Sequence, residues 1–203
     1  MTPNRVLSLL FVIFLLASYS TITKAKELTR ELIFGNPNSN VEVIEYMSLT
    51  CSHCANFHKE NIPIIFEKFV NSGKIKFIFR DFPLDGIAYQ AAIISHCVGK
   101  NNPERYYGFL NYLFQQQRNW AFSGEPILAL KRMALIAGLN PKNFEECLKN
   151  KALGDQVLLS RQEAESKYKI RSTPTLIING KVFPGSISIN EFEKTIEKLL
   201  SRN

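Results

Sequence analysis

The sequence predicts an α/β fold in which a β-α-β unit and a closing β-β-α unit are separated by a long insertion made only of helices. Short apolar runs rich in β-branched residues occur at 41–47, 75–80 and 173–178, and these predict strands. The stretch between the last two runs, residues 87–167, has helical patterning. The chain has 203 residues, and residues 26–203, which follow the predicted signal peptide, are enough for one domain with a substantial core.

The β-α-β unit comes first along the chain. Residues 41–47 carry only two charges, both glutamates, which is typical of a central strand. A helix begins at Cys51, is kinked or ended near Pro63, and is stopped by Gly73. Residues 75–80 then form a strand parallel to the first, because a helical crossover joins them. This arrangement places the start of the helix, and hence Cys51, at the carboxyl edge of the sheet, where ligands usually bind.

The helical insertion follows the second strand. Residues that end or begin helices divide it at Gly99, Pro103, Pro126, Gly138 and Asn140-Pro141. We therefore expect residues 87–167 to form a series of helices.

The closing unit contains two strands and a helix. The strand at 173–178 passes through a tight Asn179-Gly180 turn into a short strand at 181–183. A capping box, Ser188-x-x-Glu191, begins the last amphipathic helix, which ends near residue 200. The complete order of elements is that of a thioredoxin-like fold with an all-helical insertion.

The segment Cys51-Ser52-His53-Cys54 carries the clearest chemistry. Two cysteines separated by two residues can close a small disulfide ring and reopen it with little backbone movement. At a helix N-terminus the first sulfur faces unpaired N–H groups and the positive helix dipole, which lower a thiol pKa from about 8.5 to between about 3.5 and 7.5. We therefore expect Cys51 to be exposed and acidic, and Cys54, one turn further, to be buried. A partly positive imidazole at His53 would stabilise the thiolate further.

Thr173-Pro174 opens the late strand. A proline at this position cannot donate to the sheet ladder. Together with the upstream CxxC motif, it predicts a specialised, sometimes cis, position rather than an ordinary strand start.

The N-terminus has the pattern of a secretory signal peptide. Arg5 precedes an uncharged apolar run from Val6 to Ala17. The length of this run suits the apolar region of a signal peptide, about 7–15 residues, and falls short of the roughly 20 that span a membrane. Thr23-Lys24-Ala25 is the cleavage site that we favour, although residues 18–20 compete with it and an uncleaved anchor is the alternative.

We therefore expect residues 1–25 to be removed during export and residues 26–203 to form one domain in the periplasm, where disulfides persist. Removing Arg5 and Lys24 with the leader lowers the formal charge from +7 to +5. This modest excess is spread along the chain, and no basic run is interleaved with aromatic residues. We expect no nucleic-acid partner.

Two further cysteines, Cys97 and Cys147, lie in the helical insertion. An unpaired cysteine usually behaves as a small buried hydrophobe. Two leftover thiols in one helical region of an exported protein nevertheless favour pairing. We expect a structural Cys97–Cys147 disulfide, which stabilises the fold by up to about 4 kcal/mol in the chain-entropy description.

Taken together, these motifs resemble those of the DsbA family of secreted thiol–disulfide oxidoreductases. The resemblance covers essentially all of residues 26–203. It rests on five segments: Val43-Ile44-Glu45-Tyr46, Cys51-Ser52-His53-Cys54, Arg80-Asp81-Phe82-Pro83-Leu84, Gln115-Gln116-Gln117-Arg118-Asn119-Trp120 and Thr173-Pro174-Thr175.

The resemblance implies a role for each part of the site. Cys51 is expected to be the nucleophile and Cys54 the resolving thiol. Pro174 is expected to be a cis-proline packed against this pair, and Thr173 to offer backbone hydrogen bonds to a bound peptide. Ser52 departs from the proline that the family often has there, so we expect this loop to be less rigid than in those members.

The resemblance also implies that Glu45 is a buried acid that relays protons to the resolving thiol. A carboxylate in an otherwise apolar strand is costly unless it is paired or protonated. If the strands pair as predicted, Arg80 is a candidate partner for it. The alternative is that Glu45 points out of the edge of the sheet.

The expected function is that the oxidised Cys51–Cys54 pair donates its disulfide to reduced, exported polypeptides during oxidative folding. The resemblance implies reoxidation by a DsbB-like membrane protein. The alternative is a reductase or isomerase-like helper that is kept reduced in the same compartment. Related isomerases carry an N-terminal dimerisation domain, and only residues 26–40 separate the cleavage site from the first strand, so we expect a monomer.

Other classes of site fit less well, and we expect no cofactor and no metal. A zinc site needs four closely spaced ligands, and beyond one CxxC motif the chain has scattered histidines, namely His53, His58 and His96. Haem attachment needs a histidine directly after the second cysteine, where Ala55 stands. A non-catalytic binding module could use the aromatic stripe Phe109, Tyr112 and Phe114, but its helical spacing favours a core face.

Overall fold

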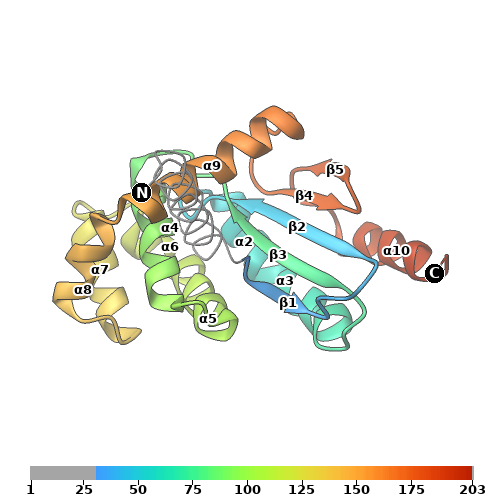
Figure 1. The fold of residues 1–203 in the computed structure, drawn as a ribbon, viewed down its shortest axis with the longest axis horizontal. Coiled ribbons are helices and arrows are strands. Elements are labelled where there is room, and N and C mark those ends of the chain that lie inside the picture. The colour runs from blue at the N-terminus through green and yellow to red at the C-terminus, as the bar shows by residue number, and fades with distance from the viewer. Residues whose placement is uncertain (1–30, 203) are drawn as a thin grey trace, which may run out of the picture. The chain divides into compact units, whose positions relative to one another are not determined.

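The structure is a computed structural model that describes residues 31–202. The signal peptide expected at 1–25 and its cleavage site lie outside the described residues. The described chain contains a five-stranded sheet with the order β1-β3-β2-β4-β5 (Figure 1). Within residues 31–202, no helix is both long enough and apolar enough to cross a membrane.

The sheet is mixed, with β2 at its centre. Its strands are β1 (Ile33–Gly35), β2 (Glu42–Met47), β3 (Lys76–Asp81), β4 (Thr175–Ile178) and β5 (Lys181–Pro184). β2 runs parallel to β3 and antiparallel to β4, and β4 and β5 form the predicted hairpin. The edge strand β1, which pairs antiparallel with β3, was not predicted, because three residues are too few to show an alternation.

The segment after β2 contains three consecutive helical pieces: α2 (Ser52–Glu60), α3 (Ile62–Ile65) and a π-helical turn, η1 (Phe66–Val70). The interruption between α2 and α3 falls next to Pro63, as predicted. Gly73 then has a φ of +69°, a backbone conformation that glycine adopts without steric cost, and it turns the chain towards β3.

The stretch between β3 and β4 is helical. Its helices are α4 (Gly86–Gly99), α5 (Pro103–Gln115), α6 (Gln117–Trp120), α7 (Pro126–Ile136), α8 (Pro141–Leu148) and α9 (Lys151–Lys167). Polar side chains cap four of them by accepting a backbone N–H: Asp85, Asn102, Asn140 and Asn150. After β5, Ser188 caps α10 (Ile189–Leu200) by accepting the N–H of Glu191, as the capping box predicts.

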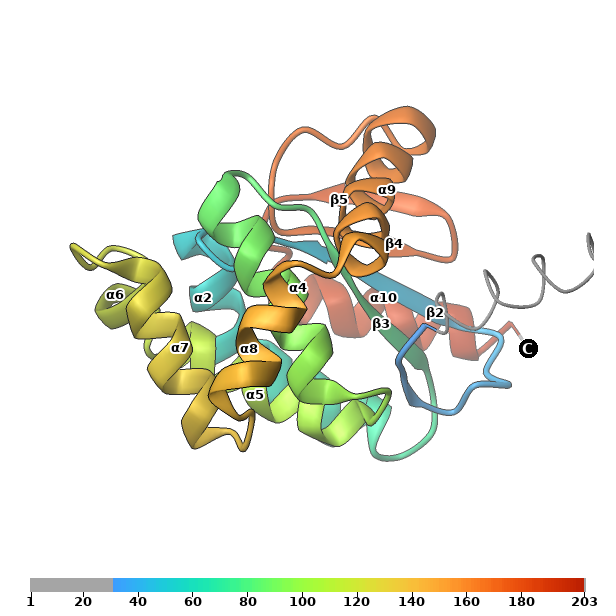
Figure 2. The same ribbon diagram turned by 60° about the vertical axis from the view of Figure 1, so that its left-hand side comes forward.

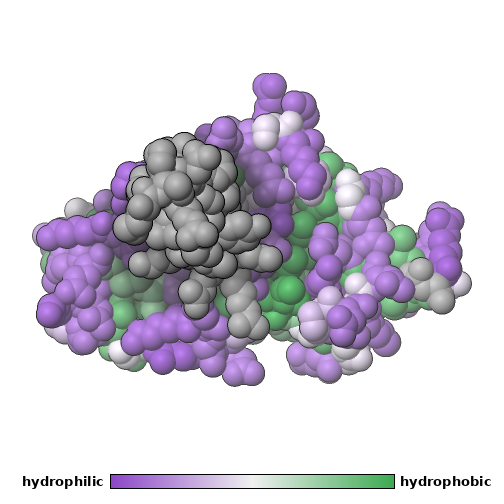
Figure 3. Space-filling model, viewed as in Figure 1, coloured by the Kyte–Doolittle hydropathy of each residue, from purple (hydrophilic) through white to green (hydrophobic). Residues whose placement is uncertain are grey.

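The two faces of the sheet are covered by different elements. Helices α4 to α8 gather beside one side of the sheet (Figures 1 and 2), and α2, α3, α5 and α10 contribute to the larger hydrophobic core. The smaller core, on the opposite face, joins Ile44 and Ile78 of the sheet to Ala164 of α9. The view in Figure 3 is hydrophilic over α7 and α8 and shows hydrophobic residues over the strands.

Alternation along β2 decides which side chains face which core. Val43 and Met47 face the larger core, whereas Ile44 and Tyr46 face the smaller one. Glu45 therefore lies on the same face as Val43 and Met47, in the layer that α2 covers. The strand thus brings a carboxylate beneath the helix that carries the CxxC motif.

Candidate active site

Cys51 stands at the point where the chain leaves the sheet and enters α2. β2 ends at Met47, and the N–H of Cys51 donates to the carbonyl of Ser48 at 3.1 Å. Cys51 is the N-cap of α2, with an extended backbone, and its carbonyl accepts the N–H of Ala55. The cysteine sulfur is therefore held at the carboxyl end of a central strand, as the β-α-β order predicts.

The two thiols of the motif are unpaired in this structure and differ in exposure. Cys51 is 8% exposed and Cys54 is fully buried. The expectation that Cys51 is exposed is therefore wrong, although Cys51 is more accessible than Cys54. The loop before β4 covers its sulfur, which donates a hydrogen bond to the carbonyl of Thr173 at 3.3 Å. The Thr173–Pro174 peptide bond is cis, and both residues are buried.

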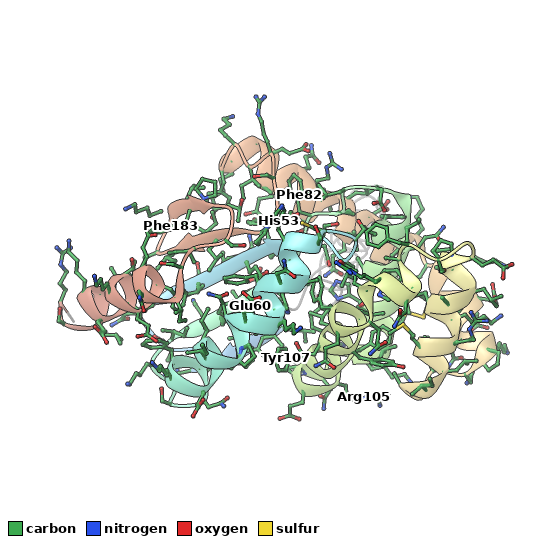
Figure 4. All side chains as sticks on the ribbon, turned by 180° about the vertical axis from the view of Figure 1, so that it is seen from behind. His53, Glu60, Phe82, Arg105, Tyr107 and Phe183 are labelled. Carbon is green, nitrogen blue, oxygen red and sulfur yellow. A yellow bond between two sulfur atoms is a disulfide. The ribbon has the colours of Figure 1, made fainter. Side chains whose placement is uncertain are left out.

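The surroundings of Cys51 favour its thiolate. Its pKa falls from 9.0 to about 5, chiefly because the Cys54 thiol donates a hydrogen bond to it. Burial opposes this shift, whereas the Thr173 side chain and the backbone N–H groups of Cys54 and His53 add to it. The Thr173 hydroxyl is buried and without another partner, so it is available to the ionised sulfur. The side chain of His53 is exposed at the start of α2 (Figure 4).

The surroundings of Cys54 favour its neutral thiol. Burial raises the pKa of Cys54 well above its ordinary value, and the neighbouring Cys51 and the negative charge of Glu45 raise it further. The Cys51 sulfur is thus stabilised as a thiolate, and the Cys54 sulfur as a neutral thiol. A nucleophilic thiol and a resolving thiol require these two protonation states.

Glu45 is fully buried, so the alternative that it points out of the edge of the sheet is wrong. Its Oε2 lies 3.1 Å from Nε2 of His58 on α2. The expected pairing with Arg80 is also wrong. The register places Arg80 opposite Tyr46, whose side chain faces the other core, and there Arg80 contacts the Tyr46 hydroxyl and Glu163. A shift of one position along a strand reverses the face, which explains the error.

Gln117 is a site residue that sequence reasoning assigned no role. It begins α6, it is 4% exposed, and its Nε2 donates to the carbonyls of Leu49 and Cys51, both at 2.9 Å. The helical insertion is thereby attached to the loop that carries the nucleophile. The only sequence signal was its place in a segment shared with the DsbA family, because a contact across 66 positions leaves no local pattern.

The remaining candidates lie elsewhere in the fold. Cys97 of α4 and Cys147 of α8 form a disulfide with an S–S distance of 2.05 Å. His96 pairs with Asp81 at 2.7 Å, and across residues 31–202 no cluster of three or more metal-binding side chains is formed. The aromatic stripe on α5 belongs to the larger core, where Phe109 and Phe114 are buried.

Comparison with known proteins places the chain in a family. The family model described as Thioredoxin matches residues 27–198. The chain belongs to the thioredoxin family.

Its relatives include disulfide-forming proteins. A Rickettsia felis protein, provisionally named a protein-disulfide oxidoreductase, is 30% identical over 84% of this chain and 60% of that protein. The chain thus spans about three fifths of the length of such Rickettsia relatives. Disulfide bond formation protein D of Bacillus subtilis is 27% identical over 83% of this chain and 76% of that protein.

The fold agrees with a solved DsbA structure. The crystal structure of Wolbachia pipientis alpha-DsbA1 superposes with a TM-score of 0.78 and 30% identity, covering 86% of this chain and 92% of that one. The resemblance to DsbA proteins and the thioredoxin-like fold with its helical insertion are therefore confirmed.

Proposed function

We propose that this chain is a protein-disulfide oxidoreductase that donates the Cys51–Cys54 disulfide to reduced, exported polypeptides in the periplasm. The observation that carries the proposal is the opposite acidity of the two thiols, with a pKa of about 5 at Cys51 and a pKa well above the ordinary value at Cys54. The names of the Rickettsia and Bacillus relatives support the same reaction class.

The reaction proceeds by two thiol–disulfide exchanges. A substrate thiolate attacks the sulfur of Cys51, the Cys51–Cys54 bond breaks, and Cys54 leaves with the electron pair and takes up a proton. A second substrate thiolate then attacks the substrate sulfur of the mixed disulfide and releases Cys51 as a thiolate. The substrate loses two electrons and the Cys51–Cys54 pair gains them.

The direction of transfer follows from the stability of the released thiolate. A thiolate at Cys51 that accepts hydrogen bonds stabilises the reduced protein, which makes the oxidised protein a strong disulfide donor. In this mechanism Pro174 and Thr173 form the wall against which a substrate segment lies beside Cys51, and Glu45 relays the proton that Cys54 takes up. Cys54 and Glu45 are fully buried, whereas Cys51 keeps 8% of its surface exposed, so substrate meets Cys51 first.

Partners and compartment follow from the same proposal. After removal of residues 1–25, the mature chain acts as a monomer, and a DsbB-like membrane protein reoxidises the Cys51–Cys54 pair. A reductase or isomerase-like helper, kept reduced in the same compartment, is the second candidate, and the favoured oxidation state at equilibrium separates the two.

The test is the equilibrium reduction potential of Cys51–Cys54, measured against glutathione on the mature chain. We expect a value near about −120 mV, as in strongly oxidising members of the superfamily. A value near about −270 mV, as in thioredoxin, would instead establish the reductase or isomerase-like helper. The control is the Cys51→Ser variant, which cannot close this disulfide. Any redox signal that it retains is the contribution of Cys97–Cys147, which is then subtracted.

A further inference from the structure

His58 is a buried titratable residue that the mechanism above does not use. It lies one helical turn after Cys54 on α2 and is 3% exposed. Aromatic rings enclose it, with centroids 4.1 Å away at Phe114 and 5.3 Å away at Phe79. Because water is excluded on these sides, its contact with Glu45 lies in a region of low dielectric constant.

The Glu45–His58 pair is only half satisfied by hydrogen bonds. Nε2 of His58 and Oε2 of Glu45 are 3.1 Å apart, while Nδ1 of His58 and Oε1 of Glu45 are both buried and have no partner. A buried carboxylate with a free oxygen is costly unless a proton is shared with it. The contact between Nε2 and Oε2 is short enough for the two side chains to share one proton.

The free oxygen of Glu45 belongs to the same layer as the resolving thiol. Cys54 and His58 are four residues apart on α2, so they project from one face of the helix. Glu45 lies beneath that face, and its negative charge acts on the Cys54 thiol. Cys54, Glu45 and His58 are thus three buried proton-binding groups in one layer of the fold.

We propose that His58 is a positioning residue that holds a proton on Glu45, so that the pair delivers this proton to Cys54 when the disulfide opens and recovers it when the disulfide closes. The inference rests on the proposed function, because it concerns a step of thiol–disulfide exchange. It adds a residue, His58, and a measurable ionisation to that step.

The step balances in atoms and charge. When an external thiolate attacks Cys51, Cys54 leaves as a thiolate and receives the proton through the Glu45 carboxyl group. A neutral imidazole and a carboxylate remain, so the pair passes from neutral to singly negative. On closure, the carboxylate accepts the proton of the Cys54 thiol, and the resulting thiolate attacks Cys51 and expels the external thiolate. Electrons move only between sulfurs.

The other ionisable groups around the pair do not duplicate this role. Tyr106 and Tyr107 of α5 lie within the field of Glu45, and burial raises the pKa of both hydroxyls, so they stay neutral near pH 7. Asp81 of β3 shares the sheet face with Glu45 but is paired with His96 of α4.

The experiment separates the two steps of exchange. Reduced mature protein is mixed with excess oxidised glutathione, quenched in acid and analysed by mass spectrometry with peptide mapping. Formation of the glutathione adduct reports attack by Cys51, and loss of glutathione reports closure by Cys54. The variants are His58→Gln, which keeps an N–H donor for Glu45, Glu45→Gln, and the two combined.

At pH 7 we expect each single variant to slow closure about 100-fold, the scale of general acid–base catalysis, with no further loss in the combined variant. Both are expected to lose the same ionisation from the pH profile of closure, while attack by Cys51 stays within about twofold. His96→Gln is the matched control, since this histidine is also paired with a carboxylate on the same sheet face, and it should close at the wild-type rate.

Other outcomes would contradict either the inference or the proposed function, and the assay distinguishes the two. Closure of His58→Gln at the wild-type rate and with the wild-type pH profile would overturn the inference. Equal slowing of attack and closure would also overturn it, because it indicates a structural role. Loss of attack by Cys51 in the wild-type protein would contradict the proposed function instead.

A measurement on the wild-type protein tests the inference even if the variants do not fold. The ring nitrogen chemical shifts of His58, followed by NMR against pH, should titrate differently in the reduced and oxidised proteins, because only the reduced protein has a Cys54 thiol to exchange with. Identical titrations in the two states would reject the inference.

Discussion

At the scale of single residues, Cys51 and Cys54 show how position alters one functional group. Both are cysteines one helical turn apart, yet the pKa of Cys51 falls to about 5 and that of Cys54 rises well above its ordinary value. Cys51 accepts hydrogen bonds at the helix start, whereas Cys54 is fully buried above Glu45. The difference in pKa therefore comes from hydrogen-bond donors around Cys51 and from desolvation of Cys54.

The Cys51 pKa predicts how the reduction potential depends on pH. Below about pH 5 the Cys51 thiol of the reduced protein is protonated, whereas above about pH 5 it is a thiolate. Reduction therefore takes up one proton more below about pH 5, so the potential falls more steeply there, by about 30 mV per pH unit. Thiolate absorbance at 240 nm in the reduced protein should titrate at the same pH and vanish in Cys51→Ser. A constant slope between pH 4 and 8 would contradict the assignment.

The same pKa predicts the sign of a stability difference. The folded-state pKa of Cys51 is below its ordinary value of 9.0, so its thiolate stabilises the folded reduced protein fully above about pH 9. This contribution is lost as the pH falls from about 9 to about 5. Urea unfolding of the reduced protein, compared with the oxidised protein at each pH, should show the loss only in the reduced form. A parallel pH dependence in the two forms would exclude it.

Among the helices, the four-residue α6 connects the helical insertion to the loop that carries Cys51. Gln117 attaches it to the loop at Leu49 and Cys51, and the indole of Trp120 donates to the carbonyl of Leu113, which ties α6 back to α5. The helical insertion therefore contributes to the geometry of the nucleophile through one amide group.

Replacing that amide tests this attachment. We expect Gln117→Leu to lower the free energy of unfolding by about 1–3 kcal/mol, because the buried Leu49 carbonyl loses its side-chain donor and the Cys51 carbonyl keeps only the N–H of Ala55. Asn119→Leu is the matched control, since Asn119 lies on the same helix and its amide is exposed, and it should change stability by less than about 0.5 kcal/mol. Urea unfolding of the oxidised proteins measures both changes. Equal stabilities of Gln117→Leu and the wild-type protein would show that the Gln117 hydrogen bonds do not stabilise the fold.

At the scale of the whole molecule, the described chain consists of a thioredoxin-like sheet with its helices and an insertion that carries its own covalent link. The Cys97–Cys147 disulfide joins α4 to α8 across 50 positions of sequence. Closing a loop of this length restricts the unfolded chain more than the short Cys51–Cys54 ring does.

Removing that link should cost about 4 kcal/mol of unfolding free energy. The variant combines Cys97→Ala with Cys147→Ala, and urea unfolding is compared with the wild-type protein while Cys51–Cys54 is oxidised in both. Thiol counting on the unfolded wild-type protein should find none under these conditions. An unchanged unfolding midpoint would show that the link does not restrict the unfolded state.

Much of the fold follows from local patterns, because strand and helix periodicity, glycine and proline positions, and capping residues act within a few positions of each other. For this reason the β-α-β unit, the helical insertion and the last hairpin could be predicted. The edge strand β1 could not be predicted, because its pairing with β3 over three residues has no pattern of its own. Position at a helix start likewise placed Cys51 correctly.

The chemistry around Cys51 depended on contacts between distant parts of the chain. The carboxylate of Glu45 contacts His58 and not Arg80, because sheet register and strand alternation assign the faces. Gln117 reaches Cys51 only because the insertion folds back onto the sheet. The order of elements and the reactive pair are local properties, so they can be predicted from the amino-acid sequence. The groups that surround the pair cannot be predicted in this way, since burial and hydrogen bonding arise when separate segments pack together.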